Sequence, residues 1–230
     1  MSVIEDNIRE IRGNIAEAAT KSGRSPSEIR LMAVTKTVDD DRILEAIGAG
    51  VDIMGENYIQ EAKRKIEKMD VDVKWHMIGH LQSNKAKYAV RLFDMVHSVD
   101  RISLAAELDK RSASAGRVTN ILVEVNVSGE ESKNGVGLNE AINLVREVSL
   151  FDNLSIRGLM TMPPWFDDPE DARPYFVALR ELRDKIIVED MKGVEMRELS
   201  MGMSGDYGVA VEEGATIVRI GTAIFGARVY

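Results

Sequence analysis

Leu31-Met32-Ala33-Val34-Thr35-Lys36-Thr37 is an apolar run that closes on a lysine, and Val51-Asp52-Ile53-Met54 is a second, shorter run. Between them, three aspartates at 39–41 suit the N-terminus of a helix that continues to about residue 48. A strand, a helix and a second strand in this order are typical of a βαβ unit, because parallel strands need a long crossover between them. The stretch from 31 to 54 therefore predicts an α/β fold.

The same alternation continues to the C-terminus. We expect six further strands at 73–78, 95–99, 120–127, 154–160, 196–200 and 216–220, and further helices at 58–69, 84–92, 102–115, 138–148, 169–188 and 207–213. Eight strands alternating with helices, without a long linker, favour a single (β/α)8 barrel of the TIM type over residues 1–230. An open doubly wound sheet is the competing fold, because alternation alone does not show closure.

An extra helix precedes the first strand. Ile4, Ile8, Ile11 and Ile15 recur every three or four residues, which predicts an amphipathic helix. Only ten residues follow the eighth strand, too few for a full helix and its loop. We therefore expect the N-terminal helix to cover the gap in the outer ring.

Composition excludes several classes of function. The 230 residues carry a net charge of −8 with scattered basic residues, so neither a nucleic acid nor an anionic membrane is an expected partner. The absence of cysteine excludes disulfides, thiolate nucleophiles and cysteine metal sites. No apolar run is long enough to span a membrane, and the first residues lack the features of a signal peptide. We expect a cytoplasmic protein.

Lys36 is the first candidate for chemistry. Sites in such barrels are built at the C-terminal ends of the strands, where this lysine ends a buried run. Partial desolvation would lower the pKa of its amine and make it a better nucleophile toward an aldehyde. The alternative, which this segment alone leaves open, is a solvated lysine that marks where the strand leaves the core.

Glycine-rich loops follow the last two strands. They are Ser200-Met201-Gly202-Met203-Ser204-Gly205 and Gly221-Thr222-Ala223. Barrels frequently bind phosphate between these two loops, where glycines allow close approach and the hydroxyls of Ser204 and Thr222 can donate. Ordinary turn glycines are the alternative.

The first and last strands are neighbours when a barrel closes, so Lys36 and this phosphate cup form a coherent pair. A ligand with an aldehyde at one end and a phosphate at the other would satisfy both, and pyridoxal 5′-phosphate (PLP) is such a ligand. A phosphosugar isomerase without a cofactor, in which Lys36 acts as an electrophile, stays open. We expect no metal, because His76 and His80 lie about 13 Å apart on an extended chain, too far for one ion.

Six motifs occur in the order found in one known family. They are AVTK (33–36), GENYIQE (55–61), WHMIGHLQSNK (75–85), RGLM (157–160), LSMGMS (199–204) and VRIGTAIFG (218–226). Together they resemble the pyridoxal phosphate homeostasis proteins (the YggS/PROSC family), which share the barrel of the alanine racemase N-terminal domain.

The resemblance implies a covalent internal aldimine between PLP and Lys36. It also implies cofactor-binding roles for Asn57, Ser204, Gly205, Arg219, Gly221 and Thr222, with Arg219 as the partner of the pyridine nitrogen. A guanidinium stays protonated and only donates, so it leaves that nitrogen unprotonated and the ring a weak electron sink. This arrangement argues against transamination.

The resemblance implies PLP homeostasis and delivery, without committed catalytic turnover and without catalytic residues. The expected partners are PLP and apo forms of PLP-dependent enzymes, and the expected state is a monomer. A PLP-dependent amino-acid racemase of low activity is the alternative. It would need a second acid/base group opposite the lysine, and Tyr58, near a strand end, stays open for that role.

Overall fold

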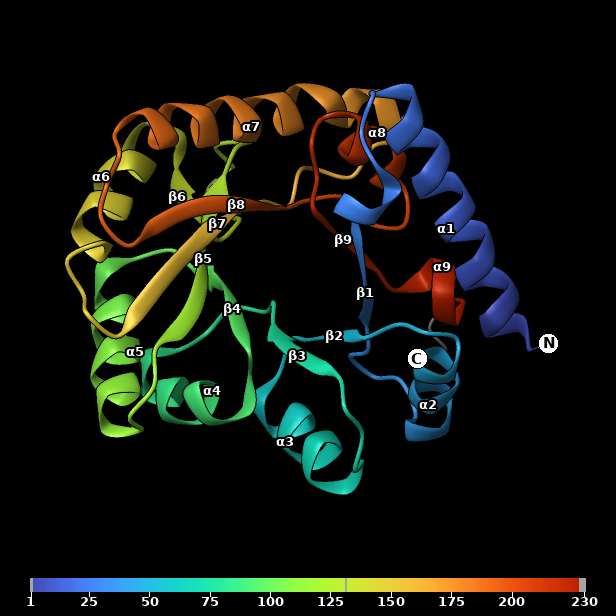
Figure 1. Ribbon diagram of the computed structural model, residues 1–230, viewed down its shortest axis with the longest axis horizontal. Coiled ribbons are helices and arrows are strands. Elements are labelled where there is room, and N and C mark those ends of the chain that lie inside the picture. The colour runs from blue at the N-terminus through green and yellow to red at the C-terminus, as the bar shows by residue number, and fades with distance from the viewer. Residues whose placement is uncertain (1, 131, 228–230) are drawn as a thin grey trace.

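The computed structural model describes residues 2–130 and 132–227 and has a closed ring of parallel strands at its centre (Figure 1). The ring consists of β1 (Arg30–Val34), β2 (Ile53–Glu56), β3 (Lys74–Met77), β4 (Met95–Val99), β5 (Thr119–Asn126), β7 (Leu154–Met160), β8 (Val194–Ser200) and β9 (Ile217–Ile220). Pairing of β4 with β5 and of β1 with β9 leaves the ring without an open edge. The predicted (β/α)8 barrel is confirmed, and the open sheet is excluded.

Helices surround the ring on its outer side (Figure 1). They are α1 (Val3–Lys21), α2 (Asp40–Gly48), α3 (Ile59–Lys68), α4 (Ala86–Leu92), α5 (Ile102–Ser114), α6 (Leu138–Val148), α7 (Arg173–Val188), α8 (Tyr207–Glu212) and α9 (Thr222–Phe225). Short 3-10 turns lie at Pro26–Glu28, Ser83–Lys85 and Pro169–Ala172. In the part of the chain that the structure describes, no helix combines the length and apolar character needed to cross a membrane.

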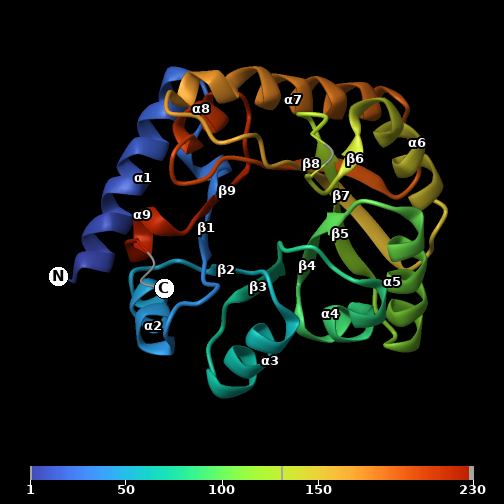
Figure 2. The same cartoon turned by 180° about the vertical axis from the view of Figure 1, so that it is seen from behind.

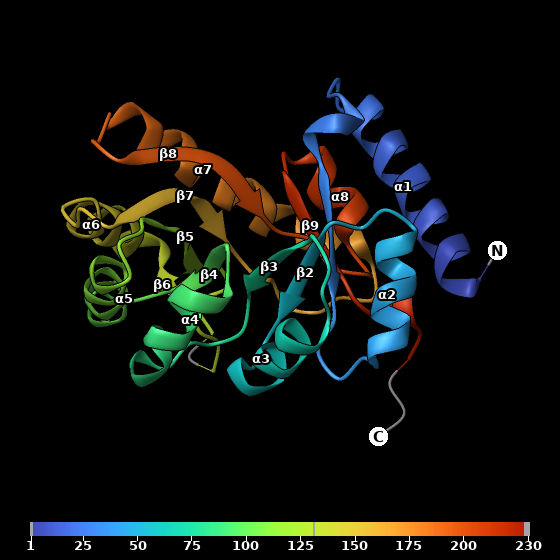
Figure 3. The same ribbon diagram turned by 60° about the horizontal axis from the view of Figure 1, so that its bottom comes forward.

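The N-terminal helix α1 completes the outer ring, as its apolar periodicity predicts. Its side chains bond to the helices on either side: Asn7 Nδ2 donates to the Ile224 carbonyl and Asn14 Nδ2 to the Tyr207 hydroxyl, both at 2.9 Å. Seen from behind, α9 lies between α1 and α2 (Figure 2). The tilted view places α1 and α2 along the same side of the barrel as β1 and β9 (Figure 3). Helix α1 therefore lies in the outer ring beside α2, α8 and α9.

Period-two alternation divides each strand between two environments. On β1, Leu31 and Ala33 face the large core between strands and helices, whereas Met32 belongs to a small cluster on the other face, inside the ring. The inner face also carries polar side chains, which is where the candidate site begins.

Three local features differ from the expectation. Strand β1 ends at Val34, and Lys36 and Thr37 form a turn instead of prolonging the strand. A two-residue strand, β6 (Val136–Gly137), pairs with the end of β5. The segment after β9 forms the single turn α9, too short to have an apolar periodicity in the sequence.

Candidate functional site

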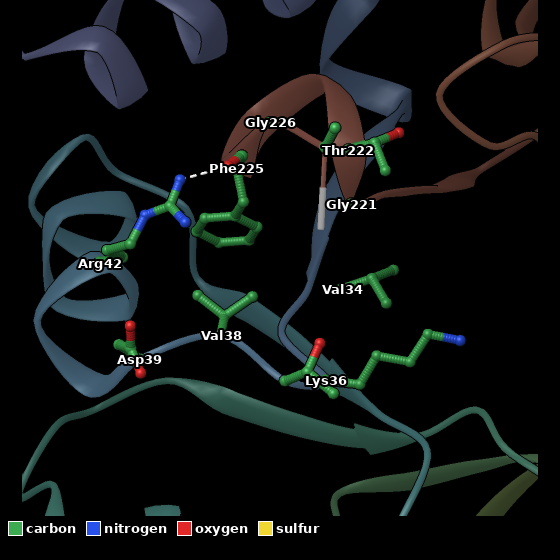
Figure 4. Close-up of a pocket in the computed structure, with 11 residues that line it drawn as sticks. Val34, Lys36, Val38, Asp39, Arg42, Gly221, Thr222, Phe225 and Gly226 are labelled. Carbon is green, nitrogen blue, oxygen red and sulfur yellow. Dashed lines mark hydrogen bonds between the residues drawn. The ribbon is translucent and has the colours of Figure 1, made fainter. Parts of the chain in front are cut away.

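Lys36 lies at the mouth of the barrel, two residues past the end of β1. Its side chain is half-buried and lines a cavity of about 360 Å³ together with Gly221 and Thr222 from the end of β9. Figure 4 shows the lysine extending away from Arg42 and Phe225, with Val34 between it and the Gly221–Thr222 segment. Closure of the barrel thus brings Lys36 beside one of the two predicted phosphate-binding loops.

The two glycine-rich loops are linked to each other. Ser204 Oγ, in the loop after β8, accepts a hydrogen bond from the Ala223 backbone N–H at 3.2 Å. Gly221 lies beside β1, since a Cβ atom at this position would be in ordinary van der Waals contact with the Val34 Cβ, at 3.5 Å. Gly205 is exposed, and a Cβ atom added to it would meet no other atom within 4 Å. The structure therefore brings Gly221 and Thr222 beside Lys36 and links Ser204 to the same loop through Ala223, with Gly205 next to Ser204 in the chain.

Asn57 lies after β2 at the position that corresponds to Lys36 after β1. Val34 of β1 pairs with Gly55 of β2, so Lys36 and Asn57 each follow that pair by two residues. The Oδ1 atom of Asn57 is buried without a hydrogen-bond partner. Its backbone is tightly enclosed, because a Cβ at Gly79 would lie only 2.4 Å from the Asn57 carbonyl oxygen. The position suits a side chain that lines a bound ligand.

Arg219 reaches from β9 across the inside of the barrel. Its guanidinium is buried and donates to Ser200 Oγ and to the Thr161 carbonyl, each at 2.8 Å, which places it at the C-terminal ends of β7 and β8. Burial lowers the pKa of Arg219 to about 10, while the nearby Asp206 and Glu124 carboxyls act in the opposite direction. The group is still cationic at neutral pH.

Sequence reasoning missed a series of hydrogen-bonded side chains that leads away from Arg219. His97 Nδ1 lies 3.0 Å from Ser200 Oγ, and His97 Nε2 lies 2.9 Å from His76 Nδ1. Burial lowers the pKa of His76 to about 4 and that of His97 well below its usual value, so both rings are neutral. Alternation within 95–99 places residue 97 on the inner face, which is the signal that could have found it.

Glu124 on β5 is a second residue that sequence reasoning missed. Its side chain is 3% exposed, and its Oε2 atom is buried without a partner. Burial, reinforced by the Asp100 carboxylate and opposed by Arg219, raises its pKa to about 7. Its only signal was a carboxyl group between the apolar residues Ile121–Val123 and Val125 of the same strand.

A buried ion cluster behind Lys36 was also missed. Lys65 on α3 is completely buried and pairs with Glu56 and Glu61, both at 2.7 Å. Ile59 and Ala62 precede it at helical spacing and are buried as well. A lysine on the apolar face of a helix is therefore the signal in the sequence.

His76 and His80, which are four residues apart in the sequence, lie in different environments. His76 contacts His97 inside the barrel, whereas His80 lies at the surface, 3.9 Å from an Asp100 oxygen. Across residues 2–130 and 132–227, no group of three or more His, Asp or Glu side chains is arranged to hold a metal ion.

Comparisons with known proteins agree with this architecture. Residues 7–229 match the family model described as alanine racemase, N-terminal domain. The chain is 43% identical over 226 residues to a pyridoxal phosphate homeostasis protein of Aquifex aeolicus (strain VF5), covering 98% of both chains. It is 40% identical over 234 residues to the protein of that name from Escherichia coli (strain K12), covering 100% of this chain and 99% of the relative.

A solved structure gives the same result in three dimensions. PipY of Synechococcus elongatus PCC7942, solved with PLP bound, superposes with a TM-score of 0.80 at 34% identity. The match covers 92% of this chain and all of PipY. The resemblance drawn from the six motifs is thereby confirmed: the chain belongs to the pyridoxal phosphate homeostasis proteins, a family built on the alanine racemase N-terminal domain.

Proposed function

We propose that this protein binds PLP through a Schiff base on Lys36 and holds it as an exchangeable store for other enzymes. The observation that carries the proposal is that Lys36 lines one cavity together with Gly221 and Thr222, which belong to a loop predicted to bind phosphate. The PLP-bound structure of PipY and the names of the curated relatives support the choice of ligand.

The donor set fits each part of PLP. The Lys36 amine suits the aldehyde, and the Ser204 and Thr222 hydroxyls, with the backbone at Gly205 and Gly221, suit the phosphate. The buried Oδ1 of Asn57, which has no protein partner, is available to a ligand group that donates a hydrogen bond. Arg219 supplies a permanent donor for the pyridine nitrogen.

Arg219 also supports storage over catalysis. Bound PLP supplies an aldehyde carbon and an electron-withdrawing ring. A guanidinium with a pKa of about 10 donates its hydrogen bond and keeps its proton, so the ring nitrogen stays unprotonated and withdraws electrons weakly. We propose that the recipients are apo forms of PLP-dependent enzymes, and that the protein acts as a cytoplasmic monomer without committed turnover.

Chemical trapping tests the assignment of the amine. Purified protein is incubated with PLP, reduced with borohydride, digested and mapped by mass spectrometry. We expect the stable pyridoxyl group on Lys36 in the wild type and in the control Lys63→Ala, which removes an exposed lysine of α3. In Lys36→Ala we expect the 36-containing peptide to carry none.

Two outcomes of this experiment contradict the proposal. Modification spread over surface lysines, with Lys36 unmodified, would remove the assigned amine. A protein that stays colourless and unaltered by added PLP would instead favour the cofactor-free isomerase.

A further inference from the structure

Among the residues that the structure describes, Lys65 is the only buried lysine. Its Nζ donates to the Thr35 carbonyl at 2.6 Å and to Glu56 Oε1 and Glu61 Oε1 at 2.7 Å each. An ammonium has three hydrogens, and these three acceptors use all of them. The amine is therefore committed to this cluster and not available to a ligand.

The cluster holds the chain on both sides of Lys36. On the N-terminal side, the Thr35 carbonyl accepts from Lys65, and Thr35 Oγ1 donates to Glu56 Oε1 at 2.7 Å. On the C-terminal side, the Thr37 backbone N–H donates to Glu61 Oε1 at 2.6 Å. Thr35 and Thr37, the two neighbours of Lys36, are therefore both hydrogen-bonded to the cluster of Lys65, Glu56 and Glu61.

The backbone at Thr37 has a conformation that its surroundings must stabilise. Thr37 has φ +61°, in the left-handed region that a β-branched residue rarely adopts. Residues held in this conformation persist only where the surroundings determine them, and such positions cluster at functional sites. The bond from Thr37 N–H to Glu61 is the contact that acts at this residue.

We propose that Lys65, Glu56 and Glu61 are positioning residues for Lys36. They set the turn that presents its amine to the barrel mouth without themselves touching the ligand. The inference rests on the proposed function, because it takes Lys36 as the reacting amine. Misplacing a reacting group by about 1 Å can slow a reaction on the order of a hundredfold. Loss of the contacts that position Lys36 should therefore slow its reaction with PLP measurably.

Substitutions at Glu61 give the sharpest test, because Lys65 itself is so deeply buried that its replacement endangers folding. Glu61→Ala removes the acceptor for the Thr37 amide. Glu61→Gln keeps a side-chain oxygen there and serves as the conservative rescue. Glu67→Ala, which breaks an exposed 3.6 Å pair with Lys63 on the same helix, is the matched control.

Two readouts separate positioning from general stability. The first is the rate of Schiff-base formation with PLP, followed by stopped-flow absorbance. The second is amide hydrogen exchange over residues 35–38 in the ligand-free protein. We expect Glu61→Ala to slow the reaction roughly tenfold to a hundredfold and to speed exchange in this segment more than in the strands of the barrel. Glu61→Gln and Glu67→Ala should stay close to the wild type in both.

The outcomes distinguish this inference from the function on which it rests. Normal PLP uptake at Lys36 with wild-type kinetics in Glu61→Ala overturns the positioning role alone. Equal slowing in Glu61→Gln and Glu61→Ala overturns it too, because the acceptor would then not be the cause. A wild-type protein that takes up no PLP at Lys36 overturns the proposed function and the inference together.

Discussion

Arg219 Nη1 donates to Ser200 Oγ at 2.8 Å inside the barrel, and the same hydroxyl lies 3.0 Å from His97 Nδ1. Because a guanidinium can only donate, Ser200 must accept from it, which leaves the hydroxyl proton free to serve His97. One arrangement satisfies the whole chain: His97 then carries its own proton on Nε2 and donates it to His76 Nδ1. A single serine thus joins the proposed partner of the pyridine nitrogen to two neutral histidines.

Removing that hydroxyl should therefore be costly. In Ser200→Ala the buried guanidinium and His97 both lose a partner, and we expect the free energy of unfolding to fall by about 1–3 kcal/mol. Urea denaturation measures this loss. Ser114→Ala, which removes an exposed hydroxyl bonded to the Lys110 carbonyl on α5, should change stability by less than about 0.5 kcal/mol. Equal stabilities for the two variants would contradict the buried network.

Glu124 should make stability depend on pH. Its folded pKa of about 7 exceeds its usual 4.5, so the folded state binds the proton more tightly, and stability is lost as pH rises from 4.5 to 7. Glu124→Gln removes this titration. Between pH 5 and pH 8 the variant should gain about 2–3 kcal/mol relative to the wild type, since 7 − 5 is two pKa units at 1.36 kcal/mol each. Denaturation at the two pH values measures the difference, and parallel curves would refute the shift.

The proposed phosphate contacts can be tested with two ligands that differ only in the phosphate. Ser204→Ala and Thr222→Val each remove a hydroxyl from the loops after β8 and β9. We expect each to weaken PLP binding roughly tenfold to a hundredfold, because a hydrogen bond to a charged group contributes about 1.5–3 kcal/mol. Affinity for pyridoxal, which has no phosphate, should not change. Equal losses for both ligands would assign the hydroxyls a different role.

Lys65 offers a test of buried-charge energetics. Lys65→Met leaves the Glu56 carboxyl buried without its counter-ion, and we expect a loss of about 3–5 kcal/mol. Burial already raises the pKa of Glu56 despite the neighbouring ammonium. Adding Glu56→Gln removes the stranded charge, so the double variant should recover part of the loss. Guanidinium denaturation of both variants measures the recovery, and additive losses would show that the two groups do not interact.

The racemase alternative makes a distinct prediction. Racemisation needs acid/base groups on both faces of the cofactor, and the side chain of Tyr58, left open for the second role, is 59% exposed. We therefore expect PLP-loaded protein to exchange the Cα hydrogen of common amino acids with deuterated water no faster than free PLP does. Nuclear magnetic resonance follows the exchange. Rapid exchange with any single amino acid would overturn the storage function.

Some secondary-structure elements could be predicted from the sequence, and others could not. The isoleucines of α1 and the apolar runs of β4 and β7 carry their own periodicity, and β4 and β7 have the expected bounds. Strand β1 was also expected, but it ends before Lys36, because a turn at residues 36 and 37 interrupts the extended chain. The loops containing Ser204 and Thr222 were recognisable because glycine and hydroxyl residues followed the last two strands. Strand β6 and helix α9 are too short for a period and could not be predicted.

The order of strands and helices, the extra helix α1 and the types of residue at the strand ends were determined by the sequence alone, because burial periodicity is a local property of the chain. Tertiary structure decided what no local pattern contains. Pairing of β1 with β9 brings Lys36 to Gly221 and Thr222 across 185 positions of sequence, and folding of α3 against the barrel places Lys65 beneath Thr35. These contacts join residues distant in the chain, and only closure of the ring and packing of its helices select them from the many that the same residues could make.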